Sequence, residues 1–196
     1  MTFARVVPLA TALVLVLSAA AWAGPPSDQL RARVDAAIAL LEDPALRAAA
    51  RTPERRAALQ RIAADIFDFP EITRRAVGRH WQEMAPSERE ELVRLFTALL
   101  ERAYVGKIEQ YAGERVVYLG DTVEGGRATV RTRLVTKQGT EIPVDYRMYA
   151  RGDRWLAYDV SIEGVSLVAN YRAQFSKIIR SGSTQALVAR LREKRE

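Results

Sequence analysis

The sequence contains no cysteine and only one histidine, and these absences exclude several kinds of chemistry. Without cysteine there is no thiol nucleophile, no thiolate metal site and no disulfide, so the core alone must stabilise the fold. A zinc site would need carboxylates for most of its ligands, and a serine–histidine–aspartate triad would have to use His80. His80 stands beside Trp81 after a predicted helix end, which favours a packing or capping role. We therefore expect no metal and no cofactor.

Sequence motifs for nucleotide binding and serine hydrolysis are also missing. The chain has no G-x-S-x-G, no P-loop and no G-x-G-x-x-G, and the glycine pair in "EGGRA" is typical of a turn between strands. Basic residues exceed acidic ones by 30 to 24, but the two signs are interspersed, which indicates a solvated surface. Weak attraction to anionic membranes or to an acidic partner is the alternative reading of this charge. We expect no nucleic-acid partner.

The N-terminus has the pattern of an export signal. One arginine in "MTFAR" precedes the uncharged run "VVPLATALVLVLSAAAWA". A basic start, an apolar stretch and a final A-x-A predict a signal peptide over residues 1–23, cleaved after Ala23. A retained membrane anchor is the alternative, but Pro8 interrupts the run and small residues end it. Residues 24–196 would then form a single domain.

Apolar residues at helical spacing predict helices in the first half of the chain and again at its end. Ser27 is the expected N-cap of the first helix, Gly78 the stop of a short third one, and Ser87 to Glu90 a capping box for the longest one. The expected helices run from Ser27 to Asp43, from Thr52-Pro53 onward, through "DFPEITRRAVG", from Ser87 to about Gly113, and over roughly 166–180 and 184–194.

Between the predicted helices, apolar residues recur at every second position instead of about every fourth. "RVVYLGD", "RATVRTRLVT", "EIPVDYRMYA" and "RWLAYDVSI" predict strands, and tight turns at Gly139 and Gly152 join the last three as an antiparallel meander. Their polar faces would pair arginines with carboxylates. These arginines are Arg131 and Arg133, and the carboxylates are Glu141 and Asp145. Leu156, Tyr158, Val160 and Ile162 are expected on one apolar face. The element order indicates an α+β fold, with helices on one face of a curved antiparallel sheet.

The stretch "WLAYDVSIEGVSLVANYRAQF" gathers residue types that could form a reaction centre. Asp159 could act as the base of an enzyme with a cone-shaped fold, which would require a polar, water-accessible pocket around it. The strand phase points Asp159 away from the apolar face, which favours hydrogen bonding near the sheet edge. Gly164 is expected to turn the chain, with Glu163 in the loop, and Ser166 to cap the following helix.

Four segments carry a resemblance to a known family. "FDFPEITRRAVGRHW", "LVRLFTALLERAY", "RTRLVTKQGTEIPVDYRMY" and above all "RWLAYDVSIEGVSLVANYRAQFSKII" resemble the MlaC or toluene-tolerance family of periplasmic lipid carriers. The likeness extends over the whole predicted mature chain. One departure is Ala85, where the family has a threonine before the proline of the long helix; the predicted capping box at Ser87 would compensate.

The resemblance implies a fold, a function and partners. The fold would be a nuclear-transport-factor-like cone with added helices, holding acyl chains in its interior. The protein would be a monomeric carrier rather than an enzyme. It would move phospholipid between an outer-membrane lipoprotein complex and an inner-membrane ABC transporter complex with an MCE-domain protein. One family branch accompanies hopanoid biosynthesis, so a hopanoid or other lipid cargo stays open.

Strand and helix phase then predicts where the acyl tails would lie, between the apolar sheet face and the long helix. Each side of this expected cavity contributes aliphatic and aromatic residues. The candidate lining residues are Phe96, Leu100, Tyr104, Val130, Leu134, Val144, Tyr146, Met148, Leu156, Tyr158 and Val160. The remaining alternative is a scaffold protein of the cell envelope with a solid core.

Overall fold

A computed structural model describes residues 25–194. The predicted signal peptide and its cleavage site therefore lie outside the described residues. The helices are α1 (Pro26–Glu42), α2 (Pro44–Arg47), η1 (Ala49–Arg51), α3 (Thr52–Ile66), α4 (Phe69–Val77), η2 (Gly78–Glu83), α5 (Pro86–Ile108), α6 (Leu167–Ser181) and α7 (Thr184–Glu193). The strands are β1 (Arg115–Glu124), β2 (Arg127–Val135), β3 (Glu141–Arg151), β4 (Arg154–Ile162) and β5 (Val165–Ser166).

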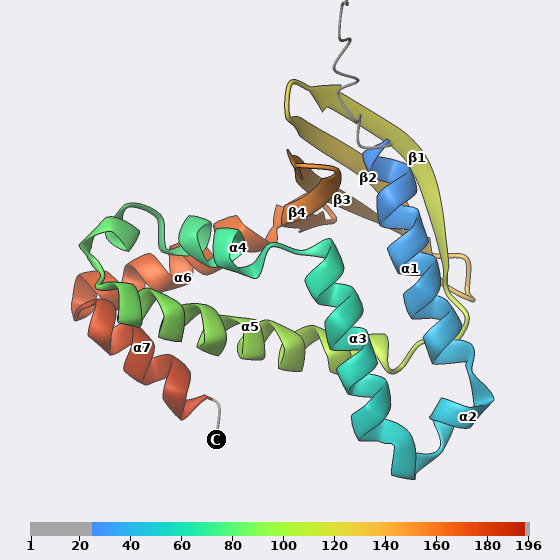
Figure 1. Cartoon of the computed structure of the whole chain (residues 1–196), viewed down its shortest axis with the longest axis horizontal. Helices are drawn as coiled ribbons and strands as arrows, with labels where there is room; N and C mark the ends of the chain where they lie inside the picture. Colours follow the sequence, from blue (N-terminus) through green and yellow to red (C-terminus); the bar gives the residue numbers. More distant parts are fainter. Residues whose placement is uncertain (1–24, 195–196) are drawn as a thin grey trace, which may run out of the picture.

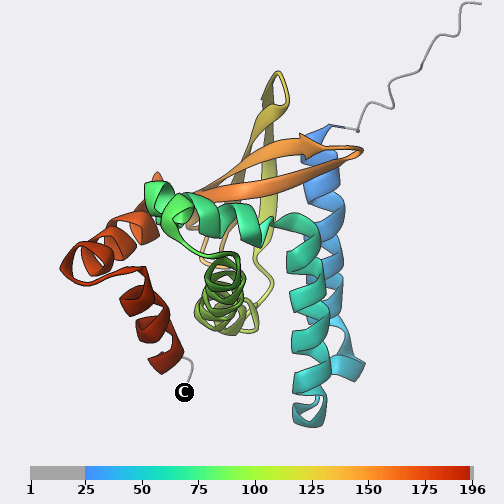
Figure 2. The ribbon, with the colours of Figure 1, turned by 60° about the vertical axis from the view of Figure 1, so that its left-hand side comes forward.

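The strands form one antiparallel sheet in the order β1-β2-β3-β4-β5. The sheet curves, and α1 and α3 run along its inner face, while α4 to α7 form a separate group of helices beside the β4 edge (Figures 1 and 2). This arrangement confirms the predicted α+β fold with a curved antiparallel sheet. In the described part of the chain, no helix is long and apolar enough to cross a membrane.

Helix ends follow local chemistry, and two of them were predicted correctly. Gly78 ends α4 with a φ of 67°, a conformation that glycine adopts without steric cost. The Ser166 side chain accepts a hydrogen bond from Ala169 N at 3.0 Å and so caps α6.

Two other predicted caps are wrong. Helix α5 begins at Pro86 with Ala85 at the N-cap, and the Glu88 side chain accepts from Ala85 N at 2.9 Å. Proline is favoured in the first turn, so the helix starts one residue before Ser87. Helix α1 likewise begins at Pro26, and Ser27 N instead donates to an Asp121 carboxylate oxygen at 3.0 Å, which fastens α1 to β1.

The register of β2 and β3 confirms the expected charge pairing across the strands. Arg131 lies opposite Asp145, and Arg133 reaches Glu141 at 2.8 Å. Both arginines are exposed, so such pairs stabilise the sheet by a few tenths of a kcal/mol at most. Because these charged side chains are exposed, this face of the β2–β3 hairpin is the one that faces solvent.

The predicted common face of Leu156, Tyr158 and Val160 is wrong, because β4 contains a β-bulge. Met148 pairs with Ala157 but Arg147 pairs with Asp159, so Tyr158 is the extra residue. The bulge reverses the alternation along β4. Val160 stays on the inner face, whereas Leu156, opposite Tyr149, lies on the outer one.

Candidate functional site

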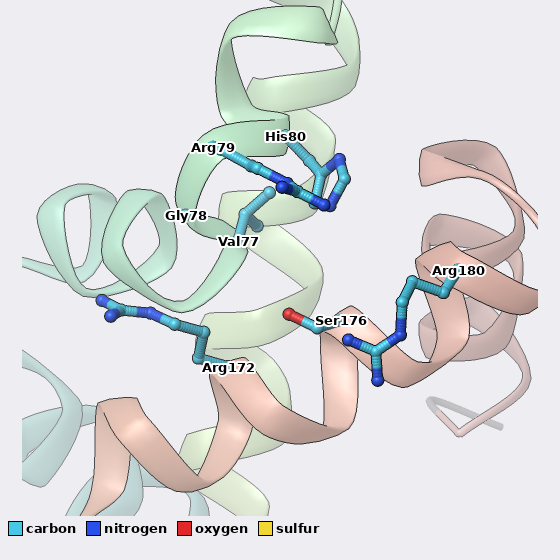
Figure 3. A pocket seen from close by; sticks show the side chains of 7 residues that line it. All are labelled: Val77, Gly78, Arg79, His80, Arg172, Ser176 and Arg180. Carbon is cyan, nitrogen blue, oxygen red and sulfur yellow. The ribbon is translucent and has the colours of Figure 1, made fainter.

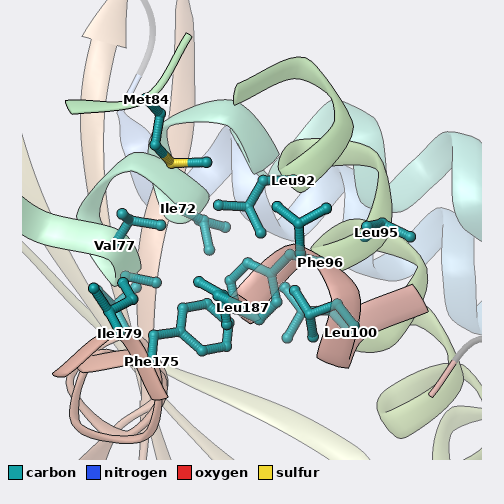
Figure 4. Close-up of a cluster of buried hydrophobic side chains, with 14 residues drawn as sticks. Ile72, Val77, Met84, Leu92, Leu95, Phe96, Leu100, Phe175, Ile179 and Leu187 are labelled. Carbon is teal, nitrogen blue, oxygen red and sulfur yellow. The ribbon is translucent and has the colours of Figure 1, made fainter. Parts of the chain in front are cut away.

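The apolar core consists of two clusters rather than one. A helical cluster draws its buried residues from α4, α5, α6, α7 and Met84 (Figure 4), and a sheet cluster draws its residues from α1, α3 and the inner face of β2 to β4. Phe96 and Leu100 belong to the helical cluster, where the Phe96 ring meets Tyr171 at 4.8 Å and Phe175 at 4.9 Å between centroids. The structure therefore places these two predicted lining residues against other helices, away from the sheet.

Val130 and Met148 lie in the sheet cluster under α1 and α3, and both are fully buried. They pack with Ala128, Trp155 and Ala157, which form the covered end of the inner face. Leu156 is buried on the outer side. These buried side chains hold the sheet against the helices, and Met148 and Trp155 also border a pocket of about 340 Å³ beside α1 and α3.

The other end of the inner face is only partly covered. Register places its side chains together: Leu134 lies opposite Val116 and Ile142, Val144 opposite Ile162, and Tyr146 opposite Val160. All of them are half-buried except Ile162, which is 37% exposed. We call this set the open apolar face. It comprises Val116, Leu134, Ile142, Val144, Tyr146, Val160 and Ile162.

Two tyrosines lie on this inner face. Tyr146 is half-buried, and burial raises the pKa of its hydroxyl to about 12. On the same face, Tyr118 is opposite Thr132, and its buried hydroxyl has no hydrogen-bond partner among the described residues.

Helix α5 brings a second apolar surface toward the open apolar face. Phe96, Leu100, Tyr104 and Ile108 follow one another at intervals of four residues and so share one side of the helix. Their exposure rises along that side, from 0% at Phe96 and 6% at Leu100, through the half-buried Tyr104, to 44% at Ile108. The stripe thus leaves the cover of the helical cluster as it approaches β1, which starts at Arg115 beside the open end of the sheet.

Tyr158 lies outside this surface. The bulge turns it toward α4, where Arg75 stands 3.9 Å above its ring and Tyr149 lies 6.1 Å away between centroids. A cation over an aromatic ring is stabilising, so Tyr158 joins β4 to α4. Of the eleven predicted lining residues, Leu134, Val144, Tyr146 and Val160 keep accessible surface on the open apolar face, whereas the half-buried Tyr104 packs against the helical cluster.

Asp159 is buried and its oxygens are occupied by local structure. Its carboxylate accepts from Ser166 Oγ at 2.7 Å and from Val168 N at 3.0 Å, and Arg147 lies 3.7 Å away. Only 4% of the residue is exposed. The predicted hydrogen-bonding role is therefore confirmed, and the water-accessible pocket that a catalytic base needs is not formed around it. Within residues 25–194, no group of three or more histidines, cysteines or acids is placed to hold a metal ion.

Asp68 plays a similar part that the sequence pattern did not reveal. It caps α4 by accepting from Glu71 N at 2.9 Å, and its other oxygen binds the Tyr149 hydroxyl and lies 3.5 Å from Arg151. Its backbone N–H donates to Ala157 O at 3.0 Å. Asp68 and Asp159 together fasten α4 and α6 to the β3–β4 pair. Only the position of Asp68 before "FPEI", as a potential N-cap, could have indicated this.

Comparison with known proteins gives a consistent result. The family model described as MlaC protein matches residues 31–193. A solved phospholipid-binding protein from Ralstonia solanacearum, determined in complex with a phospholipid, is 25% identical and superposes with a TM-score of 0.79. That match covers 88% of this chain and 97% of the other. Because the family model extends over most of the sequence, the chain belongs to the MlaC family.

Proposed function

We propose that the protein is a periplasmic lipid carrier that holds the acyl tails of a phospholipid against the open apolar face. Family membership and the phospholipid-bound relative support a lipid as ligand. The observation that carries the proposal is the open apolar face itself, a group of half-buried apolar side chains on the inner face of the curved sheet that the protein leaves incompletely covered. The half-exposed stripe of Tyr104 and Ile108 on α5 would form the opposite wall.

The physics of transfer explains why such a site needs no reactive group. Each methylene removed from water contributes about 0.8 kcal/mol, so two long acyl chains exceed about 20 kcal/mol. That value approaches the limit for non-covalent binding, and a lipid exposed to water would hardly leave its membrane. A carrier only has to match the bilayer, which an apolar surface does. The Tyr118 hydroxyl, buried and without a partner in the described residues, is suited to donate to an ester oxygen.

We propose further that this carrier is exported, loses residues 1–23, and works as a monomer between two membrane complexes. The partners would be an outer-membrane lipoprotein complex and an inner-membrane ABC transporter complex with an MCE-domain protein. A hopanoid is the alternative cargo, because a fused ring system would also fit an apolar face. The intact mass of the protein isolated from the periplasmic fraction tests this cleavage. If residues 1–23 are removed, the measured mass should be that of a chain that begins at Gly24.

A matched pair of variants tests the lipid site. Val144→Asp places a carboxylate on the open apolar face, where it would meet the acyl tails, and burying an unpaired charge is strongly unfavourable. Val117→Asp makes the same change on the opposite face of the sheet, where Val117 is 39% exposed beside Arg133. Uptake of labelled phospholipid from vesicles should fall more than about ten-fold in the first variant and stay near wild type in the second. Equal uptake by both folded variants would place the tails elsewhere.

A further inference from the structure

A basic pocket lies beside α6 (Figure 3), in the group of helices that Figure 1 shows beside the sheet, apart from the open apolar face. It has a volume of about 500 Å³ and lies between η2 and α6. Arg79 and His80 line it from η2, and Arg172, Ser176 and Arg180 line it from α6. The proposed carrier function does not use this pocket.

The local structure explains how these polar side chains come together. Arg172, Ser176 and Arg180 are four residues apart along α6, so they lie on one side of the helix. Gly78, with its φ of 67°, turns the chain from α4 into η2 and brings Arg79 and His80 over that side. In Figure 3 the Ser176 hydroxyl and the Arg180 guanidinium point into the space between the two segments.

The positive charge in this pocket is not neutralised by carboxylates. Among the described residues, those that line it include no acidic one. Arg172 uses Nε to donate to Arg75 O at 2.8 Å, which holds the side chain in place and leaves its terminal nitrogens available. Within residues 25–194, the side chains of Arg79 and Arg180 make no hydrogen bond or ion pair. The nearby Glu83 is engaged by His80 Nδ1 at 2.9 Å.

Several arginines elsewhere in the described residues are paired with carboxylates, unlike Arg79 and Arg180. On the same α4–α6 side, Arg74 and Arg75 both bind Glu71, at 2.6 Å and 2.7 Å. Near the start of α5, Glu91 is bound by Arg192 of α7 at 2.6 Å. Unpaired arginines gathered around a hollow, by contrast, create a concentrated positive field that attracts anions.

We infer that this pocket binds a phosphate group. Guanidinium groups are planar and donate paired hydrogen bonds that match phosphate oxygens, and the Ser176 hydroxyl adds a further donor. A hollow of about 500 Å³ is large enough to admit a phosphate group together with part of a molecule that carries it. The phosphate could be free in solution or carried by an anionic lipid headgroup at a membrane surface, and both sources present the same oxygens.

The experiment titrates inorganic phosphate into the mature protein and follows backbone and arginine side-chain NMR signals at constant ionic strength. The test variant is Arg172→Gln/Arg180→Gln. The matched control, Arg131→Gln/Arg190→Gln, removes the same charge from exposed sites outside the pocket. Hydrogen bonds to charged groups are strong, so the test variant should weaken phosphate binding at least about ten-fold while the control stays within about two-fold. Equal weakening in both, or no phosphate-dependent shift in the wild-type pocket, would overturn the assignment.

A second variant tests the proposal in case the double arginine variant fails to fold. Ser176→Asp adds one carboxylate inside the pocket and keeps all the arginines, so it should also weaken phosphate binding. Normal phosphate binding by folded Ser176→Asp would count against the proposal. The Val144→Asp variant should bind phosphate normally, because the open apolar face lies elsewhere; the two proposals can therefore fail independently.

Vesicles identify the source of the phosphate. Cosedimentation with phosphatidylglycerol vesicles that falls in the arginine test variant, but not in its control, would assign the pocket to a lipid headgroup. Equal cosedimentation of both variants, with phosphate binding still lost in the test variant, would assign it to soluble phosphate. Shifts of the pocket signals by a glutamate-rich peptide, with none by phosphate, would reject the proposal in favour of an acidic protein partner.

Discussion

Asp159 should be among the most sensitive positions for stability, because its buried carboxylate joins β4 to the start of α6. In Asp159→Ala, the buried Val168 N–H loses its acceptor, which costs about 1–3 kcal/mol. The Ser166 hydroxyl loses a bond to a charged acceptor, worth about 1.5–3 kcal/mol. The Arg147 pair adds little, since its guanidinium is largely exposed. We expect the free energy of unfolding to fall by about 3–5 kcal/mol.

Urea unfolding followed by circular dichroism measures this loss, and two single variants serve as controls. Ser166→Ala removes both the helix cap and the bond to Asp159, so it should cost about 2–4 kcal/mol, and Arg147→Gln less than about 1 kcal/mol. Asp159→Asn keeps one acceptor oxygen and should fall between Asp159→Ala and wild type. A loss below about 1 kcal/mol in Asp159→Ala would refute the structural role that the contacts of this carboxylate indicate.

Three further outcomes are expected. Arg74, together with Arg75, lowers the pKa of the Glu71 carboxyl in the folded protein. The ionised Glu71 side chain therefore stabilises the fold above the ordinary glutamate pKa, and this stabilisation is lost as the pH falls through the lowered pKa of the folded state. The stability difference between wild type and Glu71→Gln should therefore shrink in acid, and a constant difference would contradict the pairing. Burial raises the pKa of Tyr146 to about 12, so its contribution to stability is present below the ordinary tyrosine pKa and is lost as the pH rises through 12. Burial raises the pKa of Tyr118 still further, so Tyr146→Phe should remove one late phase from an ultraviolet pH titration and leave that of Tyr118; an unchanged titration would contradict the burial of the Tyr146 hydroxyl. Gly164→Ala should cost about 1 kcal/mol in chemical denaturation because φ is 80° there, and a neutral result would argue against that turn.

Local features were predictable where a short stretch of sequence determines them. The turn at Gly164 and the cap at Ser166 follow from residue types that suit one backbone conformation, and both are present. Strand alternation likewise placed Val130, Val144 and Tyr146 on one face. The position of Asp159 on the opposite face, with hydrogen bonds at the β4–α6 junction, also followed from that alternation.

Features set by tertiary contacts were not predictable in this way. The bulge at Tyr158 adds one residue without changing the apolar pattern, so periodicity could not reveal that Leu156 faces outward. Helical spacing identified the apolar side of α5 but could not say that α6 and α7 would cover Phe96 and Leu100. The basic pocket combines η2 with α6, segments about 100 residues apart in the chain, and only the fold brings their arginines together.

Mass spectrometry of the lipid that accompanies the purified protein tests the central proposal most directly. Protein isolated from a Gram-negative periplasm under native conditions should carry bound lipid, visible as a discrete added mass in the native spectrum and as a defined species after solvent extraction. A phospholipid would support the proposed cargo, and a hopanoid would support the alternative. Protein that carries no lipid, and that takes up none from vesicles, would contradict the carrier function.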